Sequence, residues 1–162
     1  MTVRTFLWTN LLFAGVLVVA IVASFFLADP LAARLVQKYG GSLDIDQLLL
    51  AMRLMLGCGI LAAVFLHRIF ARLLAIIATI EGGDPFTLDN ARRLGSIGWA
   101  LLAVQLMDLM LGGFTAWFHA LRVDFTAWSP ALGGWIAVLM TFVLARVFRR
   151  GAAMRDELAM TV

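Results

Sequence analysis

Cysteine is almost absent from the sequence, because Cys58 is the only one among 162 residues. A single thiol excludes an intramolecular disulfide, a CxxC redox pair and a multi-cysteine metal site within the chain. Cys58 lies inside an apolar run, so we interpret it as a small packed hydrophobic residue. The two histidines, His67 and His119, follow two separate hydrophobic runs, 47–66 and 97–117. If these runs form antiparallel helices, the two histidines lie at opposite ends and cannot bind one metal ion or clamp one haem. We therefore expect no metal site and no cofactor.

Charged residues are also scarce, at 14% of the chain against 63% hydrophobic residues. A soluble domain usually has about 25% charged and about 45–50% apolar residues. The chain also lacks a Ser-His-Asp set, an HExxH motif, a paired-carboxylate arrangement and a phosphate-binding glycine loop. Gly82-Gly83 is not followed by Lys-Ser or Lys-Thr and is interpreted as a helix terminator. These absences predict a membrane protein that is not an enzyme.

What the sequence does have is long hydrophobic runs, and a run of about 20 apolar residues crosses a bilayer core of about 30 Å. The run at 6–28 is longer than the core of a signal peptide and has Phe26 at the −3 position of a cut after Ala28, which favours a permanent span. We therefore predict an all-α membrane protein with a single domain, 1–162. Its four transmembrane helices are expected at 6–28, 47–66, 97–117 and 132–148.

Polar signals divide the runs. Asp29-Pro30 is expected to end the first span, and a polar connection follows it through Gly40-Gly41. Asp44, with Gln47 three residues later, resembles a capping box at the start of the second span. The helix of that span is expected to continue to Ile80, with Arg68, Arg72 and Thr79 on one face as an amphipathic segment at the membrane surface.

The connection between spans 2 and 3, residues 67–96, is predicted to contain a short elbow that resembles a helix-turn-helix. The sequence Glu-Gly-Gly-Asp-Pro-Phe at 81–86 breaks the preceding helix. Thr87 then caps a new one, with Asp89 in its first turn, where the helix dipole favours an anion. Farther along the chain, Ser129-Pro130 is a start signal for the fourth span.

The distribution of basic residues predicts the orientation, because cytoplasmic connections of membrane proteins are enriched in Lys and Arg. The N-terminus, the 67–93 connection and the tail at 149–162 with the end of span 4 hold nine such residues, whereas the other two connections hold three. The nine are Arg4, Arg68, Arg72, Arg92, Arg93, Arg146, Arg149, Arg150 and Arg155, and the three are Arg34, Lys38 and Arg122. Both termini and the elbow are therefore expected in the cytoplasm (N-in/C-in). Because these cations lie at the ends of apolar runs, we expect contact with anionic lipid and no direct binding to nucleic acid.

Two charged residues are expected within the spans, where charge is costly and often functional. Arg53 lies roughly 9 Å and Asp108 roughly 13 Å from the outer ends of their spans at 1.5 Å per residue. We predict that they form a buried pair, with Gln105 one turn below Asp108 as a hydrogen-bond partner. The pair either holds two helices together or senses a ligand or proton, and the sequence leaves both interpretations open.

The segment Glu81–Leu94 carries Pro-Phe-Thr, then an asparagine, then Arg-Leu leading into the third span. This pattern, together with Val147-Phe148-Arg149-Arg150-Gly151, Glu157 and the terminal Thr161-Val162, resembles a bacterial membrane family, the domain of unknown function 2975 (DUF2975). The resemblance covers the four-span layout, but only these two segments are specific. Many members are encoded beside a small helix-turn-helix regulator. The resemblance thus implies a multi-pass protein of the bacterial cytoplasmic (inner) membrane with a transcription factor as partner.

Our leading hypothesis is a non-catalytic membrane protein that docks a cytoplasmic partner, or senses for it, through the elbow and the tail. The alternative is a small transporter or efflux subunit that uses the intramembrane Asp108. An oligomer is compatible with either function. Whether the elbow docks a partner or merely aims span 3 also stays open. The residues predicted to dock are Asp84, Pro85, Phe86, Thr87, Asn90, Arg92 and Arg93.

Overall fold

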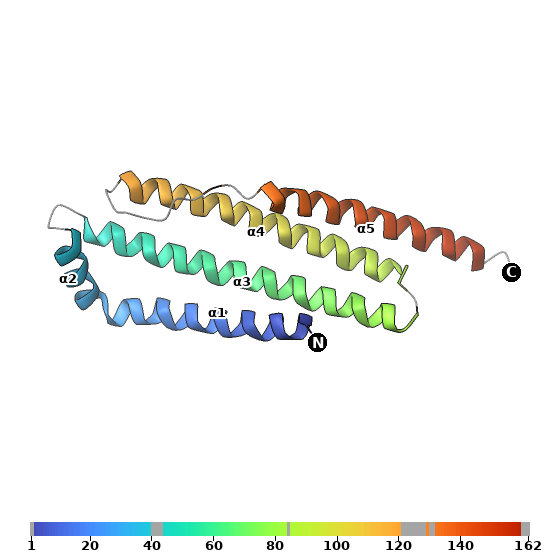
Figure 1. Cartoon of the computed structure of the whole chain (residues 1–162), viewed down its shortest axis with the longest axis horizontal. Helices are drawn as coiled ribbons and strands as arrows, with labels where there is room; N and C mark the ends of the chain where they lie inside the picture. The colour runs from blue at the N-terminus through green and yellow to red at the C-terminus, as the bar shows by residue number, and fades with distance from the viewer. Residues whose placement is uncertain (1, 40–43, 84, 121–128, 130–131, 160–162) are drawn as a thin grey trace. The chain divides into compact units, whose positions relative to one another are not determined.

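The chain is all-helical in the part that the computed structural model describes, residues 2–39, 44–83, 85–120, 129 and 132–159. Five helices follow one another along this part of the chain (Figure 1), and no strand occurs in it. Their bounds are α1 Thr2–Phe26, α2 Ala28–Tyr39, α3 Ile45–Glu81, α4 Leu88–Ala120 and α5 Leu132–Ala159.

Four of these helices are long and apolar enough to cross a membrane, with stretches at Val3–Phe26, Ile45–Glu81, Leu88–Trp117 and Leu132–Arg155. Only 6% of the apolar window in the first of them is buried by protein. Large side chains such as Trp8 and Phe26 are 71% and 84% exposed. Apolar surface on this scale is stable only against lipid or another protein. The protein is therefore a membrane protein, as its composition predicted.

The ends of the helices follow the local signals in the sequence. At the start of α3, the Asp44 carboxylate accepts a hydrogen bond of 3.2 Å from the backbone N–H of Gln47. At the start of α4, the Thr87 hydroxyl oxygen accepts one of 3.1 Å from the backbone N–H of Asn90. Both predicted N-caps are confirmed. α3 runs without interruption for 37 residues, which confirms that it continues past His67 to Ile80. It ends where Gly83 adopts a φ of 84°, a left-handed conformation that costs glycine little.

One helix was not predicted. The first span does end near Asp29-Pro30, but the connection after it contains α2, a 12-residue helix. Pro30 lies in the first turn of α2, where its missing N–H breaks no helical hydrogen bond. The break that proline introduces therefore separates two helices instead of beginning an extended loop. Pro130, part of the start signal expected for span 4, lies outside the described residues, and α5 begins at Leu132.

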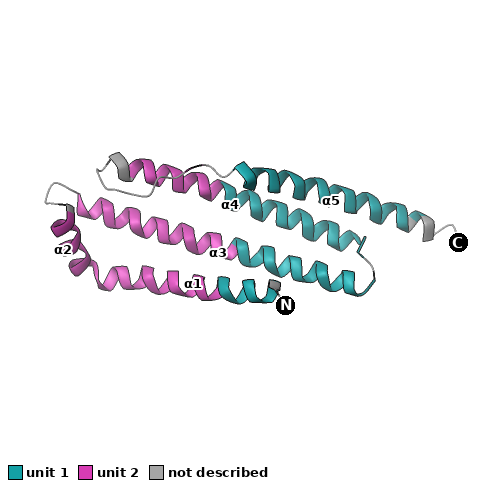
Figure 2. Ribbon diagram, in the orientation of Figure 1, with its two compact units in different colours: residues 1–10, 65–105, 131–162 teal, residues 11–64, 106–130 magenta. Residues whose placement is uncertain are grey.

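The chain divides into two compact units, coloured separately in Figure 2. Unit 1 comprises residues 1–10, 65–105 and 131–162, and unit 2 comprises residues 11–64 and 106–130. In unit 1 a core of Ile76 on α3, Leu94 and Ile97 on α4 and Ala145 on α5 joins three helices. In unit 2 a second core, Leu48 and Ala51 on α3, packs with Leu35, Met55, Phe114 and Trp117.

Candidate functional site

The elbow of unit 1 is built around Asn90, whose side chain is completely buried. Its Nδ2 group donates hydrogen bonds to the Thr79 hydroxyl at 2.6 Å and to the Pro85 carbonyl at 2.9 Å. The Thr79 hydroxyl in turn donates to the Ile76 carbonyl at 2.6 Å. A buried amide without partners would be costly. Here it connects the end of α3, the turn and the start of α4.

Arg93 completes this network from the next position on α4. Its Nη1 donates to the Asn90 Oδ1 atom at 3.0 Å and to the Ala75 carbonyl of α3 at 2.9 Å. The two donors and the acceptor of the Asn90 amide are thus all used. Thr79 had been expected on a surface face of α3 with Arg68 and Arg72. Its hydroxyl instead meets Asn90, so this end of α3 packs against the elbow.

The Phe86 side chain packs the elbow against α5. Its ring lies 5.0 Å from that of Phe148, centroid to centroid, at an angle of 39°. The ring also covers Gly151, where an added Cβ atom would come within 2.9 Å of Phe86 Cδ1. A glycine at that position therefore makes room for the ring. Phe86 still keeps 44% of its surface exposed.

The seven residues predicted to dock a partner thus fall into different groups. Five of them make contacts within unit 1, and Asp84 lies outside the described residues. Only Arg92 projects outward, with 75% of its side chain exposed and an ion pair of 3.4 Å to Asp89, which is 70% exposed. An exposed pair of this kind adds little stability. The five that make contacts are Pro85, Phe86, Thr87, Asn90 and Arg93.

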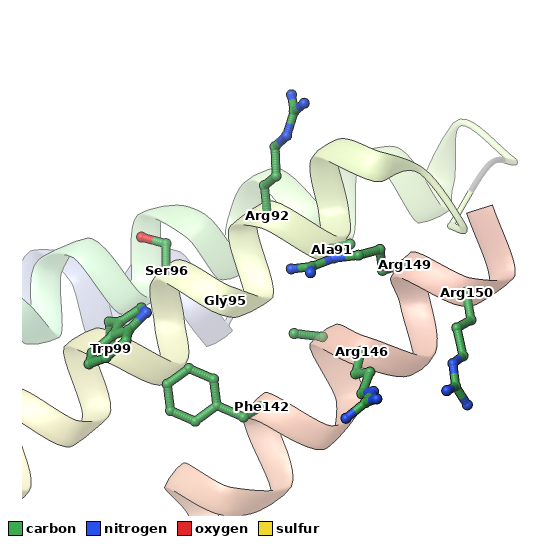
Figure 3. Close-up of a pocket in the computed structure, with 10 residues that line it drawn as sticks. Ala91, Arg92, Gly95, Ser96, Trp99, Phe142, Arg146, Arg149 and Arg150 are labelled. Carbon is green, nitrogen blue, oxygen red and sulfur yellow. The ribbon is translucent and has the colours of Figure 1, made fainter. Parts of the chain in front are cut away.

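A groove of about 730 Å³ lies between α4 and α5 in unit 1. Trp99 and Phe142 form an aromatic wall, with their ring centroids 5.5 Å apart and nearly perpendicular. Figure 3 shows Arg149 reaching from α5 into the space between the two helices, while three other arginines extend from the rims. The four arginines that line the groove are Arg92, Arg146, Arg149 and Arg150.

The sequence analysis missed this groove, although it counted all four arginines as markers of orientation. The spacing held the missing signal, because residues 146, 149 and 150 are three and four apart and share one helix face. Within the described residues, none of these three arginines has an ion pair or a hydrogen-bond partner. No sequence pattern, however, shows which helix the face will meet.

Arg53 lies in unit 2 and contacts α1. It donates to the Ser24 carbonyl at 3.0 Å and to the Ser24 hydroxyl at 3.4 Å. Its guanidinium carbon lies 4.0 Å from the centre of the Phe25 ring, a cation–π contact. These three contacts were not foreseen, because nothing in the sequence marks Ser24, 29 positions before Arg53, or its neighbour Phe25 as a partner of that arginine.

The other two residues of the expected intramembrane set lie on α4. Asp108 is half-buried, and Gln105 is buried with 7% of its surface exposed. The Gln105 amide packs directly on Gly134 of α5, where a Cβ atom would overlap it. The contacts of Arg53 described above join it to α1, and its pairing with Asp108 stays a prediction. In the part of the chain that is described, no three His, Cys, Asp or Glu residues gather as metal ligands.

Among the described residues, four helices are long and apolar enough to cross a membrane, and at most 33% of any of their apolar windows is buried within the chain, which defines the class, a multi-span α-helical membrane protein. The family model described as "Protein of unknown function (DUF2975)" matches residues 28–162. The chain belongs to that family, which confirms the resemblance found in the elbow and the tail. No curated protein and no solved structure matches it.

Proposed function

We propose that this protein is a non-catalytic docking or sensing component of a bacterial cytoplasmic membrane. In this proposal both termini and the elbow face the cytoplasm, as the excess of arginine on that side supports. A cytoplasmic reporter should then be active when fused after Val162 or near Asp84, and inactive near Gly40 or Arg122. Activity at Gly40 would contradict the four-span orientation.

The proposed partner is a small helix-turn-helix regulator, and the proposed docking surface is the outer elbow face, defined as Leu88, Asp89 and Arg92. One observation carries the proposal: the inner side of the elbow is fixed by the Asn90 network, while this outer side remains exposed. A surface held in place before binding loses little conformational entropy when a partner arrives. Arginine is enriched among the residues that contribute most to the binding free energy of interfaces.

The experiment compares two charge reversals in the full-length protein, purified in mild detergent from its native host. Arg92→Glu changes the outer elbow face, and Arg68→Glu makes the same change at an exposed arginine of α3. We expect both variants to insert and to melt like the wild type. Arg92→Glu should reduce the amount of co-purifying regulator at least about tenfold, because loss of an arginine that is a hot spot of an interface costs about 2 kcal/mol or more of binding free energy.

Arg68→Glu is the matched control and should retain the regulator. If both variants retain it, the outer elbow face is not the docking surface. If both lose it to the same degree, general positive charge explains the association. Either outcome leaves the elbow with the structural role of aiming the third span.

A further inference from the structure

We propose that the groove between α4 and α5 binds the phosphate headgroup of an anionic glycerophospholipid. Its lining contains four arginines and no acidic residue. Asp89 partly neutralises Arg92 from outside the groove, at 3.4 Å. Arg146, Arg149 and Arg150 have no such partner within the described residues, so three like charges lie on one helix face. A phosphate brought between them removes that repulsion and accepts charge-assisted hydrogen bonds.

The groove is amphipathic along its length, and this favours a lipid over a soluble anion. Arg146, Arg149 and Arg150 lie on the C-terminal side of Phe142 on α5, whereas Trp99 and Phe142 close the other end. Trp99 is 66% exposed, and the surface of α5 beyond the aromatic wall continues with exposed Leu139, Met140 and Val143. Tryptophan at such a boundary is typical of the membrane–water interface. A free phosphate would contact the arginines but would leave this apolar wall uncovered.

The size and the place of the groove agree with this ligand. A volume of about 730 Å³ is within the usual range of small-ligand sites. In the orientation proposed above, the arginines lie at the cytoplasmic leaflet, which is rich in anionic lipids. Basic pockets between transmembrane helices on that side are suited to such headgroups. The groove would then hold a lipid at the junction of the elbow and the tail segment.

The test uses the full-length protein in bilayer nanodiscs, with lipid retention measured by native mass spectrometry. We expect the wild type to retain phosphatidylglycerol over phosphatidylcholine by at least about tenfold. Arg146→Gln together with Arg149→Gln should abolish this preference. The matched control, Arg68→Gln with Arg72→Gln, removes two exposed arginines from α3 and should keep it. Arg92 stays unchanged in all variants, so the result is independent of the docking hypothesis.

Inorganic phosphate and Trp99→Ala distinguish a lipid site from a free-phosphate site. Millimolar inorganic phosphate should not displace phosphatidylglycerol, and Trp99→Ala should weaken lipid retention without lowering the melting temperature in detergent. Equal loss in the two double variants would show unspecific surface attraction and overturn the proposal. Displacement by inorganic phosphate, or no preference for phosphatidylglycerol in the wild type, would overturn it as well.

Discussion

The two units each contain a polar side chain within an apolar surrounding, and the two are held very differently. Asn90 in unit 1 is fully buried, and the partners of its side chain come from residues 79–93, with every hydrogen-bonding group of the side-chain amide used. Arg53 in unit 2 is half-buried and is held by two neighbouring residues of α1, Ser24 and Phe25. The comparison teaches that a short polar turn can build a closed network, whereas a long charged side chain makes contacts at its tip.

The largest effect is expected at Asn90. Asn90→Ala leaves the Pro85 carbonyl without its side-chain donor, deprives Arg93 of an acceptor and opens a small cavity. Such losses cost about 2–4 kcal/mol of unfolding free energy. The melting temperature in detergent should fall clearly, whereas the control Ser96→Ala, at an exposed position of the same helix, should melt like the wild type. Equal melting of Asn90→Ala and the wild type would show that the network does not hold the elbow.

A smaller effect is expected where the elbow meets α5. Phe86→Ala removes the ring contact with Phe148 and uncovers Gly151. Because the ring is 44% exposed, we expect a loss of about 1–2 kcal/mol, below the value for a fully buried aromatic. Leu88→Ala is a suitable control, since Leu88 is 45% exposed and belongs to the outer elbow face. If Leu88→Ala lowers the free energy of unfolding as much as Phe86→Ala does, the contact between Phe86 and Phe148 adds no stability beyond that of an equally exposed apolar side chain.

The smallest effect is expected at Arg53, and it decides between two partners. The observed geometry predicts a coupling of about 0.5–1 kcal/mol between Arg53→Ala and Phe25→Leu in a double-mutant cycle. The pairing predicted from the sequence requires a coupling with Asp108→Asn instead, because breaking a buried pair leaves a lone charge. The two cycles can share the Arg53→Ala variant and one detergent melting assay. If Arg53 couples to Asp108 but not to Phe25, the contacts of its guanidinium group with Ser24 and Phe25 are contradicted.

Local signals made most of the fold predictable. The apolar runs gave the four long helices, and Asp44 and Thr87 marked two of the helix starts, because N-caps depend on a few adjacent residues. α2 escaped prediction because Pro30 ends one helix and is tolerated in the first turn of the next. The sequence could not separate the outward Arg92 from the inward Asn90 and Arg93. Their roles depend on where α3 ends, and Gly83 determines that point through a backbone conformation.

The candidate site was recognisable in part for the same reason. The elbow motif drew attention to the fourteen-residue segment 81–94, and it suggested binding for five residues whose contacts lie within unit 1. Thr79 and Ala75, which complete the Asn90 network, lie on the preceding helix and carry no motif of their own. The groove needed the packing of α4 on α5, which no periodicity of either helix specifies.

The central claim is that the elbow is a fixed platform, and amide hydrogen exchange of the wild-type protein in nanodiscs tests it most directly. The backbone N–H of Asn90 donates a hydrogen bond to the Thr87 hydroxyl oxygen, and the backbone N–H of Ala91 donates one to the Thr87 carbonyl, both at 3.1 Å. We predict that both amides exchange at least about 100-fold more slowly than unstructured peptide, as expected when opening costs near 3 kcal/mol. Exchange at the rate of unstructured peptide would contradict the account, because the outer elbow face would then have no fixed support.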